Sequence, residues 1–196
     1  MSRVQPLDRS ELSEFEEAFK VIEDIMGFVP NSMLTMGRSR EILRAFSGLT
    51  GAILSASSIS RELQQLIAMV ASYSAGCRYC QAHTAHGAEK IGVDDAKIAA
   101  AFEFETSPLF DERERAVLRI ARDAGCVPNR TTDAQFEALS SHYDEKAIVD
   151  IVAVISLFGF LNRWNDTMAT DLEAGPLAFA TSQLGPAGWE PGRHAG

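Results

Sequence analysis

The sequence predicts an all-α protein built from one domain. Apolar residues recur at steps of three and four along most of the chain, the spacing that lines one face of a helix. Glycine, proline and short polar stretches separate these segments, as expected for connections between helices. With 196 residues, 46% of them hydrophobic, the chain is long enough for one sizeable core and short for two. We therefore expect residues 1–175 to form a single helical domain.

The N-terminal part is expected to contain three helices. The first covers residues 10–26, where the apolar side chains share one face and Gly27 ends the pattern. Two short helices are expected between residues 33 and 54, because three glycines interrupt an otherwise helical pattern there.

The centre of the domain, about residues 58–92, is expected to be a pair of helices that carries the reactive side chains. Ser60 can cap a helix running to about Tyr73, because its hydroxyl can accept hydrogen bonds from the first free amides. A second helix is expected to begin near Cys77 and to end at Gly92, a residue type that often closes helices in the left-handed conformation.

The C-terminal half is also predicted to be helical. Three further helices are expected over residues 93–104, 111–124 and 132–139. The apolar segment 148–161 is rich in Val and Ile, but with Asp144 as a cap and a continuation to Glu173 it far exceeds the usual strand of about 3 to 10 residues. We predict a core helix, in which Gly159 could introduce a kink.

Two further features concern the organisation of the chain. Residues 176–196 are rich in proline and glycine, so we expect an extended or disordered C-terminal tail. A long apolar helix leads to GCRYCQAHTAH in one half and to GFLNRWNDTMA in the other, with glycine at the same offset. This echo predicts a duplicated helical hairpin.

Composition excludes several classes of protein. The formal net charge of −9 has the wrong sign for binding a phosphate backbone, so no nucleic-acid partner is expected. The N-terminal residues show no signal-peptide pattern, and no stretch approaches the ~18 to 20 uninterrupted apolar residues of a membrane span. Three cysteines, two of them close together, argue against a disulfide-stapled secreted protein. A cytoplasmic location without a membrane partner is expected.

The segment GCRYCQAHTAH, residues 76–86, holds the cluster of reactive groups. Cys77 and Cys80 stand three positions apart at the predicted start of a helix, so their sulfurs can close a small disulfide. The thiolate is the reactive form, and free amides at a helix start together with Arg78 favour it. His83 lies one turn after Cys80 and could exchange its proton. Cys77, Cys80 and His83 are the candidate catalytic residues, and no cofactor is expected.

Two alternative interpretations of this segment stay open. The pattern C-x2-C-x2-H-x2-H offers zinc ligand types, but on a continuous helix His86 lies about 180° around the axis and roughly 13 Å along it from Cys77. A site with all four ligands is therefore not expected, whereas a three-ligand catalytic metal remains open. The cysteines could also be small buried hydrophobic residues and His83 a core histidine. Cys126, His142 and His194 are given no role.

The sequence resembles the carboxymuconolactone decarboxylase superfamily, in its branch of alkyl hydroperoxide reductase D-like (AhpD-like), peroxidase-related proteins. The sharpest element is VASYSAGCRYCQAH, residues 70–83. Softer elements are GFVPN at residues 27–31 and FLNR at residues 160–163, and the likeness spans about residues 26–172. The resemblance implies an AhpD-like helical bundle assembled as trimers or hexamers.

The resemblance also implies a peroxidase mechanism. Cys80 would be oxidised by a hydroperoxide, Cys77 would then form a disulfide with it, and an unknown dithiol or thioredoxin-like protein would reduce that disulfide. Two departures alter the proton relay: the family's glutamate falls on Gln65 and its histidine on Thr84, with His83 one place earlier. Glu62, Gln65 and His86 are the candidates for a replacement relay.

The leading functional prediction is therefore a thiol-dependent peroxidase that reduces hydroperoxides through a disulfide between Cys77 and Cys80. One alternative is a redox-sensing oligomer, in which oxidation of this pair changes assembly without efficient turnover. The other is a lyase of the carboxymuconolactone decarboxylase type, whose members generally lack the CxxC pair found here.

Overall fold

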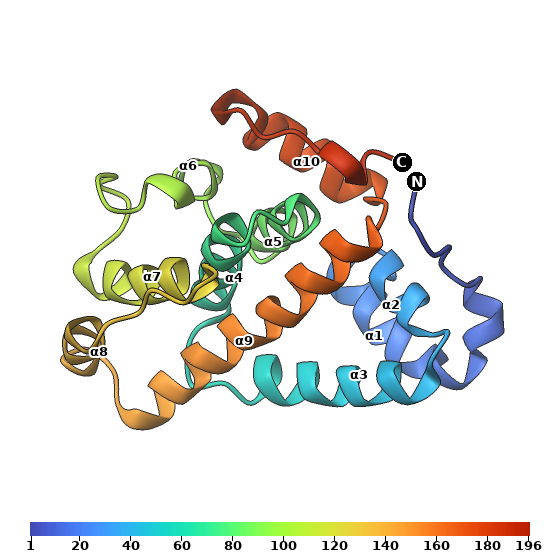
Figure 1. Cartoon of the computed structure of the whole chain (residues 1–196), viewed down its shortest axis with the longest axis horizontal. Helices are drawn as coiled ribbons and strands as arrows, with labels where there is room; N and C mark the ends of the chain where they lie inside the picture. The colour runs from blue at the N-terminus through green and yellow to red at the C-terminus, as the bar shows by residue number, and fades with distance from the viewer.

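The computed structural model describes all 196 residues, and it confirms an all-α fold of helices joined by short loops (Figure 1). The α-helices are α1 Glu16–Met26, α2 Asn31–Met36, α3 Arg40–Ser55, α4 Arg61–Ser74, α5 Arg78–Lys90, α6 Asp95–Ala99, α7 Glu112–Gly125, α8 Asp133–Ser140, α9 Glu145–Met168 and α10 Ala174–Gln183. Short 3-10 helices are η1 Arg9–Phe15, η2 Ala101–Glu103, η3 Gly185–Ala187 and η4 Gly192–His194.

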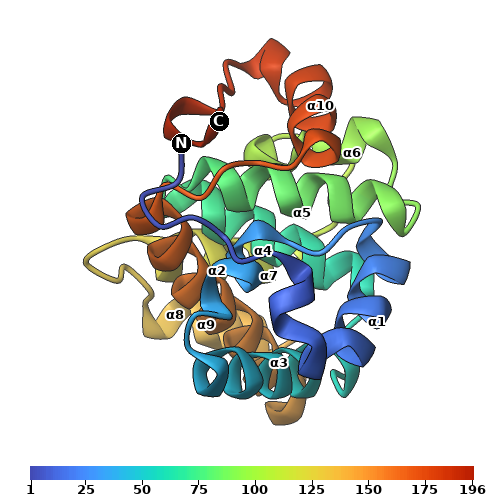
Figure 2. The ribbon, with the colours of Figure 1, turned by 90° about the vertical axis from the view of Figure 1, so that its right-hand side faces the viewer.

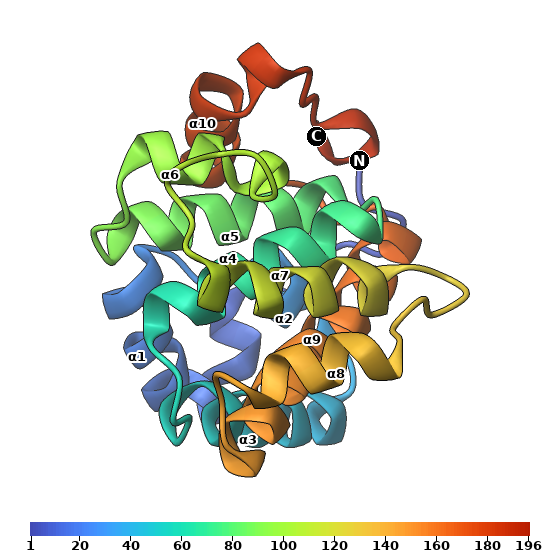
Figure 3. The same ribbon diagram turned by 90° about the vertical axis from the view of Figure 1, so that its left-hand side faces the viewer.

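Helix α4 forms the centre of the fold, with α5, α7 and α9 packed around it (Figure 3). Its apolar side chains point in almost every direction, and Leu66, Ile67 and Met69 are fully buried. Burying one such side chain contributes roughly 1.5 to 3 kcal/mol. A second, smaller cluster joins η1, α1, α2 and α3 to the middle of α9 through Leu157. The reactive segment thus begins directly after the central helix α4.

The helix boundaries follow the capping residues that the sequence indicates. The Ser60 hydroxyl accepts a hydrogen bond from the backbone amide of Leu63, and the Asp144 carboxylate accepts one from Ala147. Gly92, just after α5, has a φ of +87°, a conformation that other residues adopt only at a cost. The predicted starts of α4 and α9 and the end of α5 are therefore confirmed.

Helix α9 crosses the fold as a single helix of 24 residues (Figure 1). Its mean hydropathy of 1.6 and its length would suffice to span a membrane, but here it packs against α3, α4, α5 and α7. It runs through Gly159 without a break. The predicted second hairpin is therefore wrong, because the segment GFLNRWNDTMA continues α9, whereas GCRYCQAHTAH follows the turn between α4 and α5.

The C-terminal tail is helical and packed, so the expectation of an extended or disordered segment over residues 176–196 was wrong. Pro176 lies in the first turn of α10, where helix amides have no intrahelical partner and proline is tolerated. Ala180, Leu184 and Trp189 are buried against the main core. Glycines with positive φ separate the later short helices rather than preventing them.

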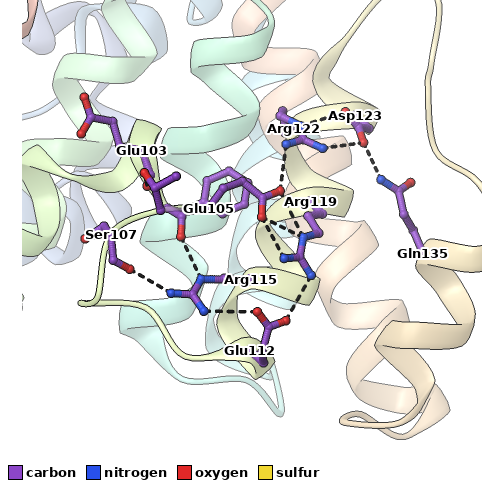
Figure 4. A network of polar contacts seen from close by, with 11 residues as sticks. Glu103, Glu105, Ser107, Glu112, Arg115, Arg119, Arg122, Asp123 and Gln135 are labelled. Atoms are coloured by element: carbon purple, nitrogen blue, oxygen red, sulfur yellow. Dashed lines mark hydrogen bonds and ion pairs between the residues drawn. The ribbon is translucent and has the colours of Figure 1, made fainter.

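A network of ion pairs fixes the loop that precedes α7 (Figure 4). Glu105 accepts hydrogen bonds from Arg119 and Arg122, one turn apart on α7. Arg122 also contacts Asp123, whose carboxylate is bound by Gln135 from α8. Single exposed ion pairs contribute little, about 0 to 1 kcal/mol, so the network matters mainly by fixing the relative position of these segments.

Candidate active site

The two cysteines of the predicted redox pair lie side by side at the start of α5. Cys77 is the N-cap residue, and its sulfur accepts a hydrogen bond from the backbone amide of Cys80 at 3.5 Å. Both cysteines are free thiols, and their exposed fractions are 0% and 2%. The structure therefore brings together the two groups needed for a disulfide, within a covered environment.

The surroundings of the two sulfurs push their pKa values in opposite directions. The side chain and backbone amide of Cys80 donate to Cys77 and lower the pKa of Cys77 below the ordinary cysteine value, although burial opposes the shift. Burial raises the pKa of Cys80 well above that value, and the neighbouring Cys77 raises it further. Helix N-termini stabilise thiolates in general. Of the two cysteines, Cys77 is thus the one whose thiolate the site favours, the reverse of the roles that the resemblance implies.

Helix α9 supplies a polar contact to this pair. The Asn165 side-chain amide donates to the Cys80 sulfur at 3.5 Å, and Asn165 itself is 1% exposed. Apolar side chains cover the rest of the pair: Phe158, Leu161 and Leu172. Asn165 is the one polar group from another helix that contacts a sulfur.

His83 lies on α5 with its imidazole turned toward the segment between α9 and α10. Its Nε2 is 2.5 Å from Oε2 of Glu173, and its ring stacks on Tyr79 at a centroid distance of 4.1 Å. Phe28 approaches the same ring edge-on. His83 forms no hydrogen bond with either sulfur, so the predicted proton exchange with Cys80 is not a direct contact in this structure.

Glu173 collects three donors around one buried carboxylate. Its Oε1 accepts hydrogen bonds from the Asn31 backbone amide at 2.6 Å and from the Tyr79 hydroxyl at 2.9 Å, while Oε2 contacts His83. Burial alone would raise the pKa of Glu173, but His83 and the Asn31 amide together hold that pKa below its ordinary value. Glu173 is therefore ionised at neutral pH, and His83 Nε2 is the hydrogen donor.

None of the three residues proposed as a relay from the sequence forms a hydrogen bond with either sulfur. Glu62 lies in the first turn of α4 and binds Lys97, roughly 20 Å along that helix from its C-terminal end. Gln65 packs over Gly87 on α5. His86 is held between the rings of Phe28 and Phe179 and makes no hydrogen bond.

No group of three His, Cys, Asp or Glu side chains is arranged to hold a metal ion.

Two functional candidates were missed by sequence reasoning. Glu173 was treated as the end of a polar continuation of the last helix, and its distance of 90 residues from His83 leaves no local pattern. Asn165 carried a signal, because an amide near the end of an apolar core helix needs a partner. His194, given no role, is 1% exposed and approaches the Tyr79 ring.

Comparison with known proteins identifies relatives that cover most of the chain. Residues 40–123 match the carboxymuconolactone decarboxylase family. The debrominase Bmp8 is 41% identical, with a TM-score of 0.85 over 90% of this chain and 95% of its own. A Bmp8 variant with a cysteine replaced by alanine, in complex with 2,3,4-tribromopyrrole, gives 40% identity and a TM-score of 0.87 over 91% of this chain and 96% of its own.

More distant relatives agree. The uncharacterized protein YdfG of Bacillus subtilis is 28% identical over 110 residues, 56% of this chain and 73% of its own. A peroxidase-related protein of Ralstonia eutropha with an AhpD core shares the fold, with 22% identity and a TM-score of 0.81 over 93% of this chain and 97% of its own. The chain therefore has the fold of AhpD-like proteins. It belongs to the carboxymuconolactone decarboxylase family, whose members include enzymes.

Proposed function

We propose that this protein is a thiol-dependent reductase of small organic hydroperoxides, in which Cys77 and Cys80 become a disulfide in each cycle. The observation that carries the proposal is that two free cysteines lie together at the start of α5, where the sulfur of Cys77 accepts hydrogen bonds from Cys80. Two neighbouring buried thiols, one of which has a lowered pKa, provide both a nucleophile and a group that resolves its oxidised form.

The two roles in the cycle follow from the opposite directions in which the pKa values of the two cysteines are shifted. The Cys77 thiolate attacks the outer oxygen of ROOH, the O–O bond breaks, and the leaving alkoxide takes a proton to become ROH. The resulting sulfenic acid of Cys77 is attacked by Cys80 and loses water. One hydroperoxide and two thiols thus give ROH, water and a disulfide, which an external dithiol reduces. His83, on the same helix as the two cysteines, is the group that we assign to returning protons.

The surroundings of the sulfurs favour an apolar substrate. Phe158, Leu161 and Leu172 cover the pair, so a substrate that reaches it must leave water. A hollow of about 420 Å³ lies beside the start of α5 and is lined in part by Gly76 and Arg78, which flank Cys77. Organic hydroperoxides are therefore expected to react faster than hydrogen peroxide.

The test compares peroxide consumption by four proteins supplied with dithiothreitol and cumene hydroperoxide. The wild type is expected to turn over, while Cys77→Ser and Cys80→Ser lose at least 100-fold in kcat/KM. Cys126→Ser is the matched control, since the hydrogen bond of that thiol goes to the backbone oxygen of Arg122, away from the pair, and the change should leave the rate unchanged. Equal rates in the wild type and either variant of the pair would refute the proposal.

A second candidate is reductive dehalogenation, which the full-length likeness to a debrominase favours. The same two thiols would serve. A thiolate takes the bromine of an aryl bromide as the aryl carbon gains a proton, and the second thiol then displaces bromide. One aryl bromide and two thiols give the arene, bromide and a disulfide. Bromide release from brominated pyrroles under the same dithiol conditions, with no peroxide turnover, would select this activity over the first.

A further inference from the structure

Glu173 is a buried carboxylate whose position is not explained by helix capping. It is the N-cap residue of α10, yet its side chain makes no capping hydrogen bond to that helix. The carboxylate turns back to α5 instead, where it meets His83 and Tyr79. Its side chain is 13% exposed, and a charge in such a place is costly unless its partners are arranged around it.

The contacts of His83 leave one ring nitrogen free for chemistry. Because the Glu173 carboxylate accepts a hydrogen bond from Nε2, that nitrogen carries a hydrogen, and the contact with Glu173 leaves Nδ1 unoccupied. Stacking on Tyr79 and the edge of Phe28 fix the plane of the ring. An imidazole held in one tautomer by a carboxylate is a recurrent arrangement for moving protons.

Tyr79 connects this carboxylate to the redox pair. It precedes Cys80 in the chain, its hydroxyl donates to Glu173, and its side chain is fully covered. One carboxylate thus binds both the residue next to a reactive sulfur and the histidine one turn further along α5. Gln65, at the position of the family's glutamate, packs on Gly87 and takes no part.

We propose that Glu173 is the positioning residue of a proton relay, and that it fixes the tautomer of His83 for the reduction carried out by Cys77 and Cys80. The inference rests on the proposed function, and it places the carboxylate of the relay on the segment between α9 and α10. Every cycle of that reaction releases an alkoxide or a carbanion that must be protonated, so a fixed imidazole has a defined task.

Both ends of the chain hold this segment in place (Figure 2). Asp171 exchanges hydrogen bonds with Ser2, and the Leu172 amide donates to the backbone oxygen of His194. The Asn31 side chain donates to the backbone oxygen of Asp171. The relay therefore depends on residues far from α5 in sequence, and the ordered tail contributes to the site.

The first test measures the tautomer of His83 by nitrogen-15 NMR, which needs no turnover. At a pH at which the ring is neutral, the wild type is expected to carry the hydrogen on Nε2, and Glu173→Ala to show a mixture of both tautomers. Glu190→Ala is the matched control, because Glu190 lies in the same tail and forms no hydrogen bond. An unchanged tautomer in Glu173→Ala would overturn the proposal, whatever the activity of the protein.

The second test is kinetic and separates this inference from the proposed function. Glu173→Ala is expected to lower kcat about 100-fold with little change in KM, and Glu173→Asp to recover part of that loss. Glu173→Gln serves if the alanine variant fails to fold. If the wild type reduces neither hydroperoxides nor aryl bromides, the proposed function fails while the tautomer result still decides the role of Glu173. Full kcat in an active protein with the Glu173→Ala change would reject the relay.

Discussion

The side-chain amide of Asn165 donates a hydrogen bond to the sulfur of Cys80 across 3.5 Å, although the two residues are 85 positions apart. This contact favours the ionised form of Cys80 against the burial that raises its pKa. In the proposed cycle, Cys80 must lose its proton to attack an oxidised Cys77, so Asn165 would assist the step that closes the disulfide.

Replacing Asn165 by alanine is therefore expected to slow disulfide formation. Loss of one hydrogen bond to sulfur is worth about 1 kcal/mol, or roughly a fivefold decrease in rate. Mass spectrometry of the thiols at intervals after one equivalent of peroxide measures this rate. Asn162→Ala is the control, since Asn162 is buried on the same helix and makes no hydrogen bond to a sulfur. Equal slowing by both variants would show a packing effect instead.

The low pKa of Cys77 predicts a pH-dependent thiolate signal. Hydrogen bonds from Cys80 lower the pKa of Cys77 in the folded protein. As the pH is raised, the ultraviolet absorbance of the Cys77 thiolate should therefore appear at a lower pH than for an ordinary cysteine. Cys77→Ser is expected to abolish this early rise, and Cys126→Ser to keep it. An early rise that survives in Cys77→Ser and disappears in Cys80→Ser would assign the thiolate to the other sulfur, as the resemblance implied.

The fold could be predicted from local patterns, whereas the site could be predicted only in part. Ser60, Asp144 and Gly92 each act on residues within one turn, so their capping roles are visible in the sequence. Cys77, Cys80 and His83 lie within the first two turns of one helix, so their proximity follows from their spacing in the sequence. Glu173 reaches His83 through the path of the chain after α9, which no local pattern encodes. The ordered tail was missed because its prolines and glycines stand at helix starts and ends.

Asp150 on α9 predicts a loss of stability in acid. Hydrogen bonds from Lys146 and from the Ser58 hydroxyl and amide lower the pKa of Asp150 to about 2. Because the folded pKa lies below the unfolded value, the stabilisation is present in full above about pH 4 and decreases as pH falls toward 2. Asp150→Asn should lower the free energy of unfolding by about 1 kcal/mol at neutral pH.

Urea unfolding at several pH values measures this effect. The difference between wild type and Asp150→Asn should shrink as the solution is acidified below about pH 4. Glu145→Gln, an exposed residue on the same helix without a hydrogen bond, should match the wild type throughout. A difference that stays constant with pH would mean that the charge of Asp150 is not the stabilising feature.

The approach of α7 to α4 depends on the absence of a side chain at Gly125. A Cβ atom there would lie 2.7 Å from the backbone oxygen of Ala71 and 3.0 Å from the Cβ of Ser74, closer than packed atoms come. Gly125→Ala must therefore move one helix against the other, and we expect a loss of about 1 to 3 kcal/mol in the free energy of unfolding. Since Ser74 lies three residues before Cys77, the same change should also slow reduction of substrate.

Gly48 provides the matched control, because it lies within α3 and a Cβ there would meet nothing within 4 Å. Gly48→Ala restricts the unfolded chain and removes the helix penalty of glycine, so we expect a gain of about 0.5 to 1 kcal/mol. Thermal and urea unfolding of both variants test the pair. Opposite signs support close contact between α4 and α7, whereas a gain in both would mean that the two helices can separate at Gly125 without cost.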